Sequence, residues 1–164
     1  MFEANVKEIL VRAGWFENRK IDITDYVKIL ESAGYEVFDA ARKFLEEFGE
    51  LNIIPKYIDS FGEEDYEEHS TCLEAINYLC KYNTNYDEEV GERTIPVFRL
   101  YRGEYNICIS ESGKFFISQG MWAKDSDNLW NGLLGEYKGG FLNWKDYKAG
   151  KEFQRSKYKN EEYF

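Results

Sequence analysis

The first 50 residues carry apolar side chains three or four positions apart, the spacing that places them on one face of an α-helix. Three such segments occur, and a glycine follows each of them, as is common where a helix ends. The segments span residues 6–13, 26–33 and 37–48, and the glycines are Gly14, Gly34 and Gly49. We therefore predict three helices at the start of the chain, the second of them capped by Asp22 or Thr24.

The pattern changes to that of β-strands at residue 94. Residues 95–101, 105–110 and 114–118 are short runs rich in β-branched and aromatic side chains. Arg102-Gly103 and Ser112-Gly113 lie between these runs and suit hairpin turns. The runs therefore predict an antiparallel meander.

Helical spacing returns between residues 129 and 134. A capping residue at Asp125, Ser126 or Asp127 precedes this segment, and Gly135 follows it. The chain thus shows helices, then strands, then one more helix. This order predicts an α+β fold with N-terminal helices, a central antiparallel sheet and a C-terminal helix.

The segment from residue 51 to residue 93 gives weaker signals. Residues 51–54 predict a short strand that stops at Pro55. The acidic stretch after it predicts a loop, or a strand around Asp65 to His69. Thr71 and Glu74 have the spacing of a capping box, which predicts a helix that buries its apolar face. Trp15 and Trp130 are expected in the core.

Composition indicates a folded chain. Its 164 residues are 43% hydrophobic and include two prolines, which excludes a collagen-like, low-complexity or disordered protein. No apolar run approaches the roughly 20 residues of a membrane-spanning helix, and no signal peptide is visible. Three cysteines are too few for a disulfide framework. We expect a cytoplasmic protein, with export by a route that needs no cleaved signal as the alternative.

The net charge of −10 is unevenly distributed along the chain. Residues 59–92 contain eleven carboxylates and one lysine, whereas residues 138–159 contain seven basic side chains and two carboxylates. The acidic segment repels nucleic acid and attracts basic partners. We divide the chain into a domain at residues 1–137 and a basic, aromatic C-terminal extension at residues 138–164. We expect the extension to dock on the domain.

Several short motifs occur in a recognisable order and spacing. They are Gly14-Trp15-Phe16 with Arg19, residues 34–38, residues 44–53, residues 90–97 and the hairpin at residues 110–114. Together, over residues 4–135, they resemble the third group of the SUKH superfamily of bacterial immunity proteins. Glu50 and Phe98 depart from that group, which often has glycine at these positions, and the extension has no counterpart in it.

The resemblance implies an α+β fold with a central antiparallel sheet. It also implies an intracellular antidote to a polymorphic toxin, commonly a nuclease or a deaminase. Such a protein performs no chemistry and binds the toxin's working surface or locks its motion. We therefore expect a cognate toxin, a basic nuclease domain, as the partner.

The acidic stretch is the candidate site for that partner. Because a nuclease holds phosphates with cationic side chains, a patch of carboxylates can occupy the same groove and steer association. Interleaved tyrosines would serve as anchors, and the alternative is a solvated loop that keeps the protein soluble. Trp122 joins the site because it falls in a predicted loop at residues 120–124. The other members are Glu63, Glu64, Asp65, Tyr66, Glu67, Glu68, Tyr86, Asp87, Glu88 and Glu89.

The sequence offers little for catalysis or metal binding. His69, Cys72 and Cys80 are the soft ligands nearest to one another, and they lack the spacing of a structural zinc site. The two cysteines are more typical of small buried side chains. We expect no catalytic residue, no metal and no cofactor.

Three other functions stay open on the sequence alone. The first is a general protein-interaction module of the same fold. The second is a nucleic-acid-binding protein whose basic, aromatic extension stacks on single strands. The third is a hydrolase that depends on His69, the single histidine of the chain.

Overall fold

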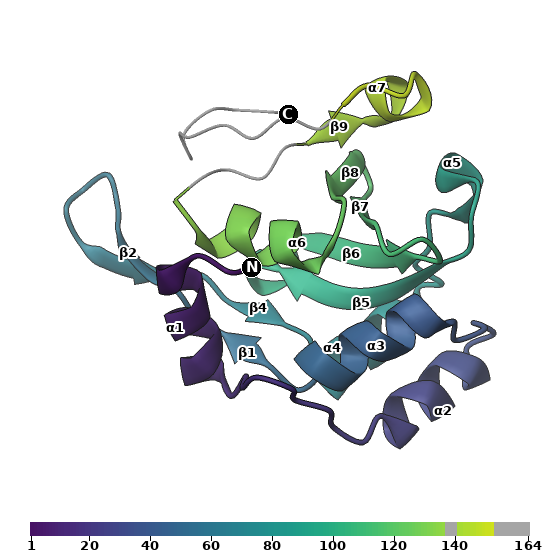
Figure 1. Cartoon of the computed structure of the whole chain (residues 1–164), viewed down its shortest axis with the longest axis horizontal. Helices are drawn as coiled ribbons and strands as arrows, with labels where there is room; N and C mark the ends of the chain where they lie inside the picture. The colour runs from purple at the N-terminus through teal and green to yellow at the C-terminus, as the bar shows by residue number, and fades with distance from the viewer. Residues whose placement is uncertain (137–140, 153–164) are drawn as a thin grey trace.

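The computed structural model describes residues 1–136 and 141–152 (Figure 1). It opens with the helices α1 (Ala4–Ala13), α2 (Thr24–Ser32) and α3 (Asp39–Phe48), which confirms the three predicted helices. Gly14 follows α1 with φ of 113°, in the left-handed region that favours glycine. The Asp22 carboxylate accepts the backbone N–H of Thr24, the first residue of α2, at 2.9 Å.

One antiparallel sheet forms the centre of the molecule, in the spatial order β1-β4-β5-β6-β7-β8-β9. The meander β5–β6–β7 corresponds to the three predicted runs. The predicted α+β fold, with N-terminal helices, a central antiparallel sheet and a C-terminal helix, is confirmed. The strands are β1 (Asn52–Ile53), β4 (His69–Ser70), β5 (Thr94–Leu100), β6 (Tyr105–Ser110), β7 (Phe115–Ile117), β8 (Gly120–Ala123) and β9 (Leu142–Asn143).

The remaining helical segments connect and cover the strands. Helix α6 is capped by Asp125, whose carboxylate accepts the Asn128 N–H at 2.8 Å. Asp125 is thus the capping residue among the three that the sequence predicted. The segments are α4 (Leu73–Lys81), α5 (Asp87–Val90), the 3₁₀ turn η1 (Tyr101–Gly103), α6 (Ser126–Leu134) and α7 (Trp144–Lys148).

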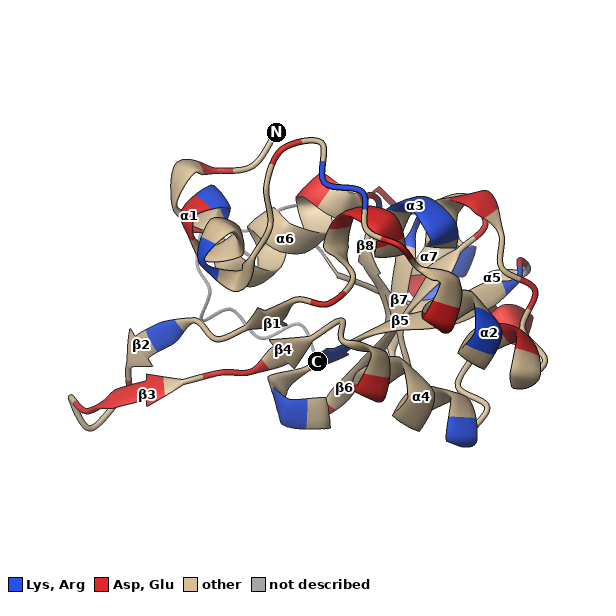
Figure 2. Ribbon diagram, turned by 90° about the horizontal axis from the view of Figure 1, so that it is seen from below, with Lys and Arg blue, Asp and Glu red and all other residues tan. Residues whose placement is uncertain are grey.

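A two-stranded ribbon, β2 (Lys56–Ile58) and β3 (Glu64–Tyr66), lies between β1 and β4 in the chain and forms a separate small sheet. It projects from the body at one end of the long axis, on the left of Figures 1 and 2. The loop predicted for the acidic stretch is therefore wrong, whereas the strand predicted around Asp65 to His69 agrees in part with β3 and β4. We call residues 54–68, the ribbon with its turn and flanks, the projecting hairpin.

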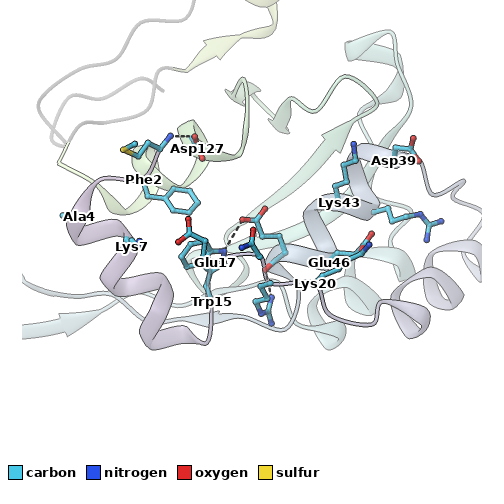
Figure 3. A pocket seen from close by; sticks show the side chains of 15 residues that line it. Phe2, Ala4, Lys7, Trp15, Glu17, Lys20, Asp39, Lys43, Glu46 and Asp127 are labelled. Carbon is cyan, nitrogen blue, oxygen red and sulfur yellow. Dashed lines mark hydrogen bonds and ion pairs between the residues drawn. The ribbon is translucent and has the colours of Figure 1, made fainter.

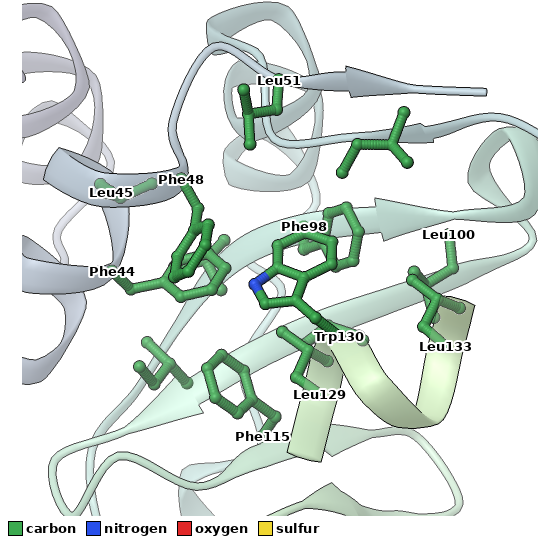
Figure 4. Packing of buried hydrophobic residues seen from close by; sticks show 14 of the residues in the cluster. Phe44, Leu45, Phe48, Leu51, Phe98, Leu100, Phe115, Leu129, Trp130 and Leu133 are labelled. Atoms are coloured by element: carbon green, nitrogen blue, oxygen red, sulfur yellow. The ribbon is translucent and has the colours of Figure 1, made fainter. Parts of the chain in front are cut away.

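Aromatic and aliphatic side chains from the helices and the sheet form one main core (Figure 4). Trp130 of α6 is fully buried, and its ring lies 5.2 Å from that of Phe48 and 5.1 Å from that of Phe98. Trp15 is also buried, so both tryptophans predicted for the core lie there. Phe98 follows a bulge in β5 and fills space beside Trp130.

A smaller cluster covers the other side of β7 and β8. Phe115 belongs to the main core, whereas its neighbour Phe116 packs with Val90, Met121 and Leu142. Trp144 of α7 stacks on Phe116, with ring centroids 5.7 Å apart. The described part of the C-terminal extension, residues 141–152, thus contributes a strand to the sheet and covers this cluster. The rest of the predicted extension and residue 137 lie outside the described residues.

The capping box predicted at Thr71 and Glu74 is wrong. Cys72 is the N-cap residue of α4, and no side chain caps this helix. Thr71 is fully buried, its hydroxyl accepts the Leu51 N–H at 3.0 Å, and the same hydroxyl donates to the Phe48 carbonyl. The hydroxyl therefore satisfies backbone groups between α3 and β1 instead of the end of α4.

Candidate functional site

The carboxylates predicted as one site lie in two places. Those from Glu63 to Glu68 belong to the projecting hairpin, whereas Asp87, Glu88 and Glu89 belong to α5, at the opposite end of the long axis (Figures 1 and 2). The sheet explains this separation. Ser70, just beyond the hairpin, pairs with Arg99 near the end of β5, whereas α5 precedes the start of that strand. The two groups do not form a contiguous surface.

The projecting hairpin has a regular register. Lys56 pairs with Tyr66, Tyr57 with Asp65 and Ile58 with Glu64. Backbone hydrogen bonds continue this register at both ends of the ribbon: the Asp59 N–H donates to Glu63 at 2.8 Å, and the Glu67 N–H donates to Pro55 at 3.0 Å. The acidic residues are therefore held at fixed positions on an extended ribbon.

The same hairpin exposes large apolar side chains. Phe61 at its turn is 88% exposed, Ile58 is 67% exposed, and Ile54, Tyr57 and Tyr66 are exposed as well. A two-stranded ribbon is marginally stable by itself in water, because it buries little apolar surface. Large apolar groups gathered on one projecting element are typical of a protein-binding surface.

The 3₁₀ turn η1 fastens the root of the hairpin to the body. The Arg102 N–H donates to the Glu68 carbonyl at 2.7 Å, and its guanidinium donates to the Tyr66 carbonyl at 3.1 Å. The guanidinium also lies 4.2 Å above the Tyr66 ring. Tyr101 and Arg102 both have positive φ, 50° and 59°, which costs free energy for residues with a side chain. This strained turn fixes the direction in which the hairpin leaves the body.

The α5 group takes part in holding the fold together. The Asp87 carboxylate accepts the backbone N–H of Thr94, and also its hydroxyl, both at 2.7 Å. The half-buried Tyr86 donates its hydroxyl to the Asn106 carbonyl at 3.2 Å, and burial raises its pKa. Glu89 pairs with Lys148 of α7 at 3.2 Å. These side chains fasten α5 to β5, β6 and α7.

The loop predicted around Trp122 is wrong. Residues 120–123 form β8, which pairs with both β7 and β9. Trp122 is half-buried and packs against the main core. Its ring is therefore not a free surface group of the kind that the sequence suggested, and the basis for assigning it to the site is removed.

A family model, SUKH-3 immunity protein, matches residues 2–136. The chain belongs to the SUKH-3 immunity protein family. The matched SUKH-3 region includes the projecting hairpin and α5 and ends next to Gly135, which follows α6. Strand β9 and helix α7 lie beyond it. No curated protein and no solved structure matches the chain.

Two residues of the sequence motif Gly14-Trp15-Phe16 with Arg19, namely Trp15 and Arg19, line a hollow of about 1040 Å³ (Figure 3). Trp15 donates its indole N–H to the Glu47 carboxylate at 3.3 Å, and the buried Arg19 donates to the Glu47 carbonyl at 2.6 Å. Burial raises the pKa of Glu47. Because Arg19 satisfies a carbonyl in the last turn of α3, the motif joins the α1–α2 connection to that helix. The hollow carries side chains of both charges and is not selective for one sign.

His69 links the hairpin to the sheet of this SUKH-3 protein. It is fully buried, its Nδ1 accepts the Tyr101 N–H at 3.1 Å, and its Nε2 lies 3.4 Å from the Glu67 carboxylate. The half-buried Cys72 and Cys80 have thiol pKa values raised by burial, to about 11 for Cys80. A protonated thiol is a weak nucleophile and a weak metal ligand. Neither cysteine therefore has the lowered thiol pKa of a nucleophile activated by His69.

The described residues contain neither a cluster of metal ligands nor a membrane-spanning helix. Across residues 1–136 and 141–152, no group of three histidine, cysteine or carboxylate side chains could hold a metal ion. Within the same ranges, no helix has the length and apolar character needed to cross a bilayer.

Proposed function

We propose that this SUKH-3 protein is the cytoplasmic antidote to a cognate bacterial toxin and that it acts by binding, without catalysis. Membership of an immunity protein family supports the antidote role. The projecting hairpin supports the site, because it combines carboxylates with exposed apolar side chains on an element that stands clear of the body. Protection at nanomolar concentrations needs a Kd of about 1 nM or below, roughly −12 kcal/mol.

The toxin is a basic protein in this proposal, and a nuclease fits it best. A nuclease carries cationic side chains where it holds phosphates, and a ribbon bearing carboxylates can enter the same groove. Binding there would block the toxin's active surface directly. The charge of the hairpin supports this partner, since four glutamates and two aspartates lie between residues 59 and 68.

Nucleic acid is a weaker candidate as a partner. Trp144 and Tyr147 of the extension pack their rings against Phe116, 5.7 Å and 5.2 Å away, so these rings are committed to the smaller cluster. The part of each half-buried ring that packs against Phe116 is not available to stack on a base.

Co-expression tests the antidote role. The product of the gene immediately upstream should stop the growth of a host when expressed alone, and this chain should restore growth. An Ile58→Asp/Phe61→Asp variant should fail to restore growth while folding normally, because both side chains are exposed. A Glu88→Lys variant on α5 is the matched control and should protect like wild type. An upstream product that is harmless, or that stays toxic beside wild type, would contradict the proposal.

A further inference from the structure

The two faces of the projecting hairpin differ in chemistry. Side chains alternate between the two faces along each strand. The register pairs each odd-numbered residue with an odd-numbered one and each even-numbered residue with an even-numbered one. Odd-numbered residues therefore share one face of the ribbon, and even-numbered residues share the other. The odd face holds Pro55, Tyr57, Asp59, Glu63, Asp65 and Glu67. The even face holds Ile54, Lys56, Ile58, Glu64, Tyr66 and Glu68.

The odd face is acidic. It has four carboxylates and no lysine or arginine among its hairpin residues. The Tyr57 side chain lies close to these carboxylates and donates its hydroxyl to Asp65 at 3.3 Å. The pKa of Tyr57 is raised, first by desolvation and then by the charges of Asp65, Glu67 and Asp59. Three of the four carboxylates thus act on one hydroxyl, and the fourth, Glu63, pairs with Asp59 in the register, so the odd face carries one negative field.

The even face is apolar and has balanced charges. Lys56 lies 3.4 Å from the Glu64 carboxylate, and Arg102 covers the Tyr66 ring. Between these polar groups, Ile54, Ile58 and Tyr66 present exposed apolar surface. Phe61, 88% exposed, lies at the turn outside this alternation and adds apolar surface at the tip of the ribbon.

A hollow continues the even face toward the body. It measures about 470 Å³, and Glu68, Arg102, Arg99 and Tyr78 are among its lining residues. The Arg99 guanidinium lies 4.0 Å above the Tyr78 ring. Arg102 touches Tyr66 of the even face and also lines the hollow, so the even face and the hollow adjoin. Together they offer apolar contact area with hydrogen-bonding groups at one end.

We propose that the even face, together with Phe61 at the tip of the ribbon, docks the toxin and that the odd face steers its approach. This proposal rests on the antidote role proposed above and names the partner's chemistry: a protein surface with an apolar cleft bordered by lysine or arginine side chains. Buried apolar and aromatic side chains determine most of the dissociation rate of a protein complex. Unpaired surface charges determine mainly the association rate and its dependence on salt.

Kinetics on the intact chain separate the two roles. The probe is the toxin domain encoded immediately upstream, inactivated by mutation and immobilised. Ile58→Ala/Phe61→Ala should raise the dissociation rate at least tenfold and change the association rate less than threefold. Glu63→Gln/Asp65→Asn should lower the association rate at low salt about tenfold and leave the dissociation rate within threefold.

Matched controls guard against general effects. Glu64→Gln removes one carboxylate from the even face and should leave the association rate within twofold of wild type. Phe16→Ala removes a side chain that is 59% exposed on another part of the surface and should leave the dissociation rate unchanged. A photoreactive phenylalanine analogue at position 58 should cross-link to the toxin, and the same analogue at position 65 should do so at least fivefold less. This second measurement needs no loss of binding.

The outcomes distinguish the two proposals. If the wild-type chain does not bind the toxin domain, both the antidote role and the face assignment are overturned. If wild type binds and the two double variants change the same rate constant, or if position 65 cross-links as well as position 58, the face assignment alone is overturned. The face assignment is supported if the Ile58/Phe61 variant changes mainly the dissociation rate, the Glu63/Asp65 variant changes mainly the association rate, and position 58 cross-links more than position 65.

Discussion

Glu50 has φ of 59°, in the left-handed region that costs an L-residue about 1–2 kcal/mol. Its carboxylate accepts the Tyr26 hydroxyl at 2.9 Å. Glu50→Ala removes this hydrogen bond and keeps the backbone cost, whereas Glu50→Gly removes both. We predict that the glycine variant is more stable than the alanine variant by about 1 kcal/mol in urea unfolding. Equal midpoints would contradict the assigned strain.

Thr71 carries a buried hydroxyl with backbone partners on two elements. Thr71→Val keeps the shape and leaves the Leu51 N–H without its partner, so the free energy of unfolding should fall by about 1–3 kcal/mol. Thr71→Ser should recover most of the loss. Glu74→Ala should cost less than about 0.5 kcal/mol, because Glu74 is exposed and caps nothing. If chemical denaturation shows similar losses of unfolding free energy for the Thr71 and Glu74 variants, the predicted capping box would be supported after all.

Glu47 gives the stability a pH dependence of known sign. Burial raises its pKa in the folded state, so the folded chain binds its proton more tightly than the unfolded chain does. Ionisation therefore costs stability as the pH rises through the ordinary glutamate value and up to the folded one. Glu47→Gln keeps an acceptor for Trp15 and removes this cost. The variant should melt higher than wild type at pH 7, and the difference should shrink toward pH 4.

At the scale of elements, the helices were predictable because each buries a stripe of side chains at helical spacing, as Leu10, Leu30 and Phe44 show. The ribbon β2–β3 was predicted only in part, as a strand around Asp65 to His69. Its residues are mostly exposed, so neither face carries the buried apolar residues that mark a strand packed on a core. Strand β9 has two residues and exists through its pairing with Gly120 and Met121. Such pairing is a tertiary event that no local pattern records.

Helix α7 should contribute measurably to stability. Trp144 stacks on Phe116 and donates its indole N–H to the Ser118 carbonyl at 2.7 Å. Trp144→Ala should lower the free energy of unfolding by about 2–4 kcal/mol, because it uncovers the smaller cluster and leaves that carbonyl without its donor. Lys145→Ala, an exposed neighbour on α7, should change it by less than about 0.5 kcal/mol. Unfolding by urea measures both, and a neutral Trp144 variant would show that α7 does not support the fold.

At the scale of the whole molecule, the two groups of predicted site carboxylates lie at opposite ends of the long axis. The carboxylates of the projecting hairpin lie at one end and those of α5 at the other (Figure 2). The sequence identified both groups by residue type and could not separate them, because their distance depends on how β4 and β5 pair. The division of the hairpin into two faces depends on the register Tyr57 to Asp65, which the sequence also leaves open.

One measurement tests the central claim, that the projecting hairpin binds the toxin. Residues 57–65 are replaced by Asn-Gly, a two-residue turn that joins Lys56 to its partner Tyr66. Since the removed residues lie outside the core, the melting temperature should stay within a few degrees of wild type. Calorimetric titration with the upstream toxin domain should show an affinity at least about 100-fold weaker. Wild-type affinity in the shortened chain would contradict the account.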